Sequence, residues 1–328
     1  MQLTRSTGST GGRRGQPLAP LLLLAITALL TACVSAPRDI AYDQTLISGE
    51  AAFGHVIEPA ASTNMLALSD EMVTFLGRDL TGASFEMPRL VRLMKKLKRA
   101  GYFDDPYDPD GTYSAATTFA ERRGNCMGYT NMFVALARAS GLPAKFQYVE
   151  HKPSWDVEGG FLVRNNHINV LMEELTQPGR NPTTIVVDFN RMQNDIASER
   201  RRVVSDAYAE SLYYGNLAVD QLHLGDHEGA FSLLKRAIIT APENHALWNN
   251  LGVLYSTLQR PVLAERAFEQ ALVFDRRDKT ALSGLVVALR NQSRHEEADD
   301  IAKRIRNYQM KRQRRAAAEM LGIVRAET

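Results

Sequence analysis

The spacing of hydrophobic and polar positions changes several times along this chain, and the changes predict its secondary structure. Downstream of residue 113, apolar residues at helical spacing predict a helix over 114–122 and a second helix that begins at Cys126. Gly141 and Pro143 end the second helix, because glycine accepts the left-handed cap conformation and proline cannot continue a helix. Beyond this point, runs with many β-branched and aromatic residues predict short strands. These runs are residues 145–149, a strand or broken pair over 161–164 and 166–170, and residues 184–189.

The last third of the chain contains an internal repeat of constant length. The repeat is marked by leucines and alanines at equivalent positions, namely Leu217, Leu251 and Leu285, and Ala230, Ala264 and Ala298. Small residues let two helices approach closely and large residues fill the space to the next pair, so the pattern predicts stacked helical hairpins. It resembles the tetratricopeptide repeat, with about three units over residues 209–312, of which the last is weaker because of Gly284 and Val286. The histidines of this region lack metal-ligand spacing and are expected at the surface. They are His223, His227, His245 and His295.

The N-terminus carries basic residues followed by a short apolar run. This run is too short for a confident bilayer span, so residues 1–32 are predicted to be a signal peptide. The run ends in Leu30-Thr31-Ala32-Cys33, which resembles the lipobox of bacterial lipoproteins and implies that Cys33 becomes a lipidated N-terminus. An ordinary signal peptide is the alternative. Val34 is not acidic, which favours the outer membrane, and the small polar residues of 33–63 are predicted to form a linker away from the membrane.

Composition and charge narrow the classes of function. The chain has 328 residues, and its 39 Lys and Arg are balanced by 37 Asp and Glu, which argues against a nucleic-acid binder. Residues 313–328 are expected to form a basic C-terminal tail. There is no glycine-rich phosphate loop, and the aspartate-rich stretch 104–111 fails the spacing of a calcium loop. We therefore expect neither a cofactor nor a metal.

Cys126 is the candidate nucleophile. At the start of a helix, unpaired backbone N–H groups and the helix dipole favour an anion, and the thiolate is the reactive form of cysteine. His167 and then Asp188 follow Cys126 along the chain, each on a predicted strand. A cysteine, a histidine and an aspartate in this arrangement fit the roles of nucleophile, base and orienting carboxylate. Taken singly, each could be a buried core residue, and His151 is a rival base.

Residues 107–189 resemble the transglutaminase-like branch of the papain-type superfamily. The resemblance rests on Arg123-Gly124-Asn125-Cys126, on residues 133–144, and on His167 and Asp188, whose distances along the chain lie within the usual range of that family. It implies that Cys126 attacks an amide carbonyl, that His167 exchanges its proton and that Asp188 orients the imidazole. The backbone N–H of Cys126 would contribute to the oxyanion hole.

Two residues depart from the pattern of this family. Asn125 precedes the cysteine, where many relatives carry Asp or Glu, and this change is minor. Asn169 follows His167 by two positions, where many relatives carry tryptophan. The loss of an aromatic wall near the thiol leaves the class of substrate open, since relatives on this fold cleave peptides, deamidate or cross-link glutamine, or have lost catalysis.

The sequence therefore predicts an α+β transglutaminase-like (papain-type) domain over 64–208, followed by an all-α tetratricopeptide-repeat solenoid. We expect a lipid-anchored thiol hydrolase or acyltransferase of the bacterial cell envelope, at the outer membrane and facing the periplasm. It would act on an amide bond of a protein, peptide or peptidoglycan-linked substrate, with repeats over 211–302 that recruit the substrate or a protein partner. A strict transglutaminase and a catalytically inactive scaffold that binds envelope proteins through its repeats are the alternatives.

Overall fold

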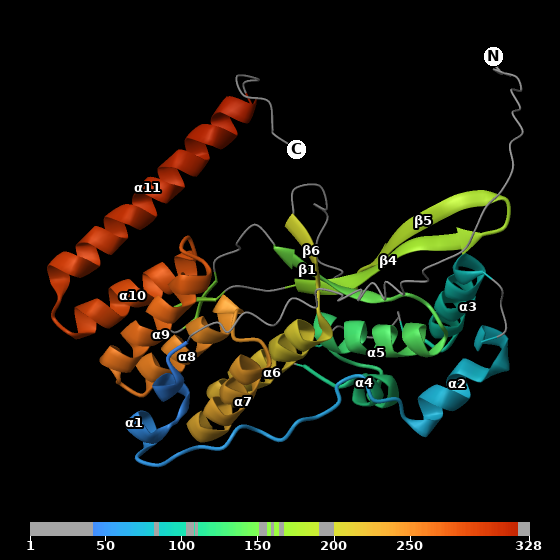
Figure 1. Ribbon diagram of the computed structural model, residues 1–328, viewed down its shortest axis with the longest axis horizontal. Coiled ribbons are helices and arrows are strands. Elements are labelled where there is room, and N and C mark those ends of the chain that lie inside the picture. Colours follow the sequence, from blue (N-terminus) through green and yellow to red (C-terminus); the bar gives the residue numbers. More distant parts are fainter. Residues whose placement is uncertain are drawn as a thin grey trace, which may run out of the picture. The chain divides into compact units, whose positions relative to one another are not determined.

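The computed structural model describes residues 42–81, 85–102, 108, 111–150, 156–158, 161–163, 167–189 and 200–320. The predicted signal peptide, Cys33 and the rival base His151 lie outside these residues, as does most of the aspartate-rich stretch 104–111. The described residues are mostly helical, with a small sheet, and belong to one structural unit (Figure 1). Within this described part, no helix is both long and apolar enough to cross a membrane.

Short helices dominate the first half of the chain. They are the 3-10 helix η1 (Gln44–Ile47), α1 (Glu50–Phe53), α2 (Asp70–Thr81), α3 (Glu86–Arg99), α4 (Ala115–Glu121) and α5 (Cys126–Ala139). The helices α4 and α5 lie where the hydrophobic spacing predicts them. Ser114 caps α4 by accepting a hydrogen bond from the N–H of Thr117, and Arg122 ends it in the left-handed conformation.

A four-stranded antiparallel sheet positions the site, with the strand order β5-β4-β1-β6. Its members are β1 (Lys145–Glu150), β4 (His167–Gln177), β5 (Arg180–Val187) and β6 (Arg200–Val204). A separate pair joins β2 (Asp156–Glu158) to β3 (Phe161–Val163), so β3 and the start of β4 belong to two different sheets and are not one strand. In Figure 1, α5 runs alongside the sheet.

The sequence pattern does not predict β6, because the strand begins with a run of arginines, Arg200-Arg201-Arg202. Among the described strands it lies at the edge of the sheet and pairs with β1, and charged side chains are typical of edge strands. The guanidinium of Arg202 lies over the rings of Tyr148 and Tyr208, 5.0 and 4.3 Å from their centroids. These cation–π contacts hold a charged strand on the sheet.

Described residues 206–320 form three helical hairpins. The hairpins are α6 (Asp206–His223) with α7 (His227–Thr240), α8 (His245–Thr257) with α9 (Pro261–Phe274), and α10 (Lys279–Asn291) with α11 (His295–Met320). Their second helices begin at equivalent positions of the repeat, as the sequence pattern predicts. Gly284, which weakens the last unit by sequence pattern, has a packing role: a methyl group there would collide with the Phe268 ring. The helix α11 continues to Met320 and so includes part of the predicted tail.

The described part of the expected linker, residues 42–63, packs against the hairpins instead of extending freely. Its backbone is held by side chains of the repeats: Tyr255 donates to the carbonyl of Leu46 (2.5 Å), and Arg236 Nε donates to that of Ala60 (2.6 Å). Leu46 is buried in the common core. Composition does not reveal this packing, because a few apolar residues and satisfied backbone groups suffice to fix an irregular segment.

Candidate functional site

Cys126 is the first residue of α5, and the residue before it fixes the start of the helix. The Oδ1 of Asn125 accepts a hydrogen bond from the N–H of Gly128 (3.1 Å), and its Nδ2 donates to Thr112 Oγ1 (2.6 Å). This cap leaves the N–H of Cys126 without an acceptor inside the helix. The half-buried sulfur therefore lies at the positive end of the helix dipole, where negative charge is stabilised.

His167 is the first residue of β4 and is 3% exposed. Its Nε2 lies 2.7 Å from Asp188 Oδ1, and its ring also interacts electrostatically with the Cys126 side chain. Because Nε2 is engaged by the carboxylate, Nδ1 is the nitrogen left for the sulfur. The hydroxyl of Thr130 on α5 donates to the carbonyl of Ile168 (3.2 Å), which ties the helix to the start of the strand.

Asp188 follows β5 directly, and neighbours on both sides hold it in place. Its Oδ1 faces His167, and its Oδ2 accepts a hydrogen bond from Asn169 Nδ2 (2.9 Å). The next residue, Phe189, packs on the rings of Tyr129 and Phe133, with centroids 5.8 and 5.7 Å apart. The carboxylate therefore has its orientation set by β4 and by α5 together.

The charge state of the imidazole follows from these contacts. Burial alone would lower the pKa of His167, but hydrogen bonds to Asp188 and to Cys126, together with their charges, raise it to about 9. The ring is therefore protonated at neutral pH and presents a positive charge to the sulfur. The arrangement can therefore supply a nucleophile and, from the same ring, a proton.

Asn169 has a role that the sequence interpretation misses. By sequence it is a departure from the family pattern, whereas in the structure its amide holds the second oxygen of Asp188 and is fully buried. The available signal is the alternation of β4, which puts residues 167 and 169 on one face of the strand. Asn125 is likewise more than a substitution for an acid, since its amide oxygen caps α5 and its amide nitrogen donates to Thr112.

A second amide extends this polar row across the sheet. Gln147 on β1 stands opposite Asn169 in the strand register, and both residues are buried. The Oε1 of Gln147 and the Oδ1 of Asn169 have no hydrogen-bond partner among the described residues. Either a water between them or a turned Gln147 amide that donates to Asn169 would satisfy the Asn169 oxygen.

Comparisons with known proteins place a family domain on this site. The model of the transglutaminase-like superfamily matches residues 76–173, which include Cys126 and His167, while Asp188 lies beyond the match. Residues 76–173 thus form a transglutaminase-like domain. No curated protein matches the chain.

Two solved structures are similar to part of the chain. The crystal structure of MamA protein is 18% identical with a TM-score of 0.31, and the match covers 33% of this chain and 59% of that one. A mutant of MamA is 21% identical with a TM-score of 0.28, and the match covers 32% and 74% of the two chains. The chain therefore spans about three-fifths of the length of the first of these structures.

Proposed function

We propose that this protein is an envelope-anchored thiol hydrolase or acyltransferase that acts on an amide bond of a protein, peptide or peptidoglycan-linked substrate. The observation that carries the proposal is the continuous series of contacts from Cys126 to His167 to Asp188, with the sulfur half-buried at a helix N-terminus. The match to the transglutaminase-like superfamily supports the same chemistry, because it covers the cysteine and the histidine.

In the first step the Cys126 thiolate attacks the carbonyl carbon of the amide. A C–S bond forms, and the carbonyl π electrons move to the oxygen, which the N–H of Cys126 can stabilise as an oxyanion donor. When the tetrahedral intermediate collapses, the C–N bond breaks and the imidazolium of His167 transfers its proton to the leaving nitrogen. The products are a free amine and a thioester on Cys126.

In the second step an acceptor attacks the thioester. The neutral imidazole of His167 removes a proton from water or from an amine, the acceptor bonds to the acyl carbon, and the C–S bond breaks to restore the thiolate. Asp188 keeps the ring in one orientation throughout and stabilises its charged form. Water as acceptor gives hydrolysis, and an amine gives transamidation.

The remaining parts of the chain would place this site in the cell. Lipidation at Cys33 would anchor the protein at the outer membrane, facing the periplasm. The hairpins over 206–320 would act as a tetratricopeptide-repeat solenoid that recruits a substrate or a protein partner. Residues 42–63 pack on the hairpins and lead directly into the predicted catalytic domain. A partner bound to the hairpins would therefore be held close to that domain.

The experiment that tests the chemistry is the pH dependence of Cys126 alkylation by iodoacetamide. It compares the wild-type chain with His167→Ala and, as a matched control, with the exposed His55→Ala. The proposal expects fast alkylation at neutral pH that His167→Ala slows and His55→Ala leaves unchanged. A slow thiol that is indifferent to His167 would overturn it and favour the inactive scaffold, which pull-downs with the hairpins would then test.

A further inference from the structure

The two junctions between successive hairpins can be compared position by position, because the repeat has a constant length. At the first junction Asn244 caps α8, where its Oδ1 accepts a hydrogen bond from the N–H of Ala246 (3.3 Å). Its amide also bonds the preceding hairpin, since Nδ2 donates to Ser211 Oγ (3.1 Å) and the hydroxyl of Tyr208 lies 3.3 Å from Oδ1. Neutral side chains therefore suffice to cap the helix and to join the two hairpins.

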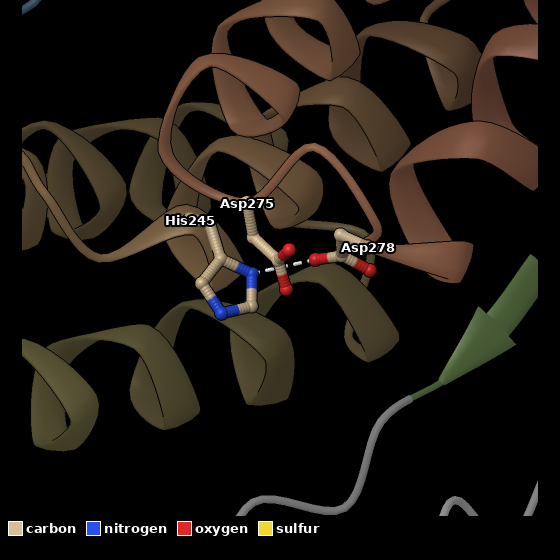
Figure 2. A group of neighbouring side chains, drawn as sticks. All are labelled: His245, Asp275 and Asp278. Carbon is tan, nitrogen blue, oxygen red and sulfur yellow. Dashed lines mark hydrogen bonds and ion pairs between the residues drawn. The ribbon is translucent and has the colours of Figure 1, made fainter.

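At the second junction the equivalent positions carry a different set of side chains (Figure 2). Asp278 caps α10 through its Oδ1, which accepts from the N–H of Thr280 (2.8 Å). Its Oδ2 lies 2.5 Å from His245 Nδ1 and 2.7 Å from Asn249 Nδ2. Asp275 stands beside them, and the ligand atoms of His245, Asp275 and Asp278 all lie within 4.8 Å of one another. Capping and bridging alone do not require this concentration of charge.

The substitutions between the two junctions are specific. The counterparts of His245, Asn249, Asp275 and Asp278, each one repeat unit earlier, are Ser211, Gly215, Ala241 and Asn244. At the second junction these four positions carry an imidazole nitrogen, an amide oxygen and two carboxylates, all of which can ligate a metal ion. The sequence pattern predicts His245 at the surface, whereas in the structure its side chain is partly buried, with 16% exposed.

We propose that His245, Asp275 and Asp278 bind a divalent transition-metal ion. One imidazole nitrogen and two carboxylate oxygens form a donor set that suits Zn²⁺ and its neighbours, whereas Mg²⁺ and Ca²⁺ prefer oxygen alone. Ligand bonds to zinc are about 2.0–2.2 Å long, so two ligands on one ion are at most about 4.4 Å apart. In a tetrahedral site the same bond lengths place ligand atoms about 3.4 Å apart. The ligand atoms here all lie within 4.8 Å of one another, so side-chain movement would have to bring the most distant of them closer together.

Asn249 provides an independent observation that points to a ligand at this place. It is 4% exposed, its Nδ2 touches Asp278, and its Oδ1 has no hydrogen-bond partner in the described part of the chain. If the amide turned, Oδ1 would face the same centre and supply a fourth ligand. The part of the site left open by the half-buried His245 and Asp275 would be completed by water. Such an ion would join the first turn of α8 to the turn between α9 and α10, and thus two hairpins to each other.

The test is zinc binding by the full chain, with Cys33→Ser and Cys126→Ser present in every sample so that no thiol competes. Equilibrium dialysis followed by elemental analysis gives the stoichiometry, and Co²⁺ in place of Zn²⁺ gives a visible spectrum that reports the coordination. We expect one Zn²⁺ per chain and a melting temperature that rises with zinc. The variant His245→Ser/Asp275→Ala/Asp278→Asn places the first junction's residues at three of the four differing positions, keeps a capping residue, and should lose both effects.

Two further variants separate a loss of zinc binding from a loss of folding and from binding to unrelated histidines. Asp275→Ala leaves the His245–Asp278 contact and the cap of α10 in place, so it should fold and bind zinc at least about tenfold more weakly. His223→Ser/His295→Ser removes exposed histidines of the same hairpins and should bind zinc as the parent does. Absence of bound zinc in the parent, or equal binding in the triple variant, would overturn the proposal and leave the cluster as a hydrogen-bonded junction.

Discussion

Two His–Asp pairs in this molecule have nearly the same contact and differ in what surrounds it. His167 and Asp188 are 2.7 Å apart, while His245 and Asp278 are 2.5 Å apart. The histidine is the buried partner in the first pair, with side chains 4% and 35% exposed, and the aspartate is the buried partner in the second, with 16% and 2%. The third group is a thiol in the first pair and a carboxylate, Asp275, in the second.

The comparison teaches that the third side chain and the placement of the carboxylate decide what a His–Asp pair can do. Beside a sulfur, the carboxylate of Asp188 can orient an imidazole for proton transfer. Asp278 lies beside a second carboxylate and also caps α10, so it stabilises the fold. Together these side chains form a candidate set of metal ligands. Mutations in the first pair should therefore affect activity, with an effect on stability that depends on pH, and mutations in the second should affect stability at every pH.

The sharpest test of this division is the removal of the sulfur. Cys126→Ala should abolish turnover of any amide substrate that the wild type accepts, a loss of at least about 10³-fold, because the acyl intermediate forms on this sulfur. The midpoint of urea unfolding should change little, since the side chain is small and half-buried. Unchanged function together with a loss of several kcal/mol would instead identify a packed core thiol.

The second pair should show the opposite behaviour. Asp278→Ala removes the cap of α10 and leaves His245 and Asn249 without their partner, so we expect a loss of about 3 kcal/mol in the free energy of unfolding. Asp278→Asn, which imitates Asn244, should lose clearly less. Urea titrations of these two variants and of Asp188→Ala make the comparison at pH 10, where the charged form of His167 no longer contributes to stability, and a larger loss for Asp188→Ala at that pH would contradict it.

The dependence of stability on pH should also distinguish the first His–Asp pair from the second. The pKa of His167 is about 9 in the folded chain against about 6.5 in the unfolded chain. Its raised pKa therefore contributes stability that is fully present below pH about 6.5 and is lost as the pH rises through about 9, on the order of 3 kcal/mol in total. The difference in melting temperature between the wild type and His167→Ala should shrink from pH 6 to pH 10. Over the same pH range, the rates of Cys126 alkylation in the two proteins should become equal. A difference that is constant with pH would show that the ring is neutral in the folded state.

Local signals in the sequence predict the elements that carry the site, and long-range contacts explain what they miss. The cap and spacing around Cys126 predict α5, and the order of cysteine, histidine and aspartate predicts residues that the structure does bring together. The structure shows that proximity, and the catalytic roles of the three residues stay a prediction. The sequence does not predict strand β6 or the packing of residues 42–63, because each depends on partners far away in the chain. The sequence does not predict the His245 cluster for the same reason, since its residues come together only when two hairpins stack.

Asn169 offers the finest test of the first pair, since it acts through Asp188 and not on the sulfur. Its amide fixes the second oxygen of that carboxylate. Asn169→Ala should lower kcat by about tenfold, a cost of about 1.4 kcal/mol that is typical of one buried hydrogen bond, and should leave KM nearly unchanged. It should also move the alkaline limb of alkylation to lower pH, because a carboxylate free to rotate supports the imidazolium less well. Gln147→Leu is the matched control, since Gln147 lies one strand further from Asp188. A merely structural role for Asn169 would reduce stability in both variants and move the pH limb in neither.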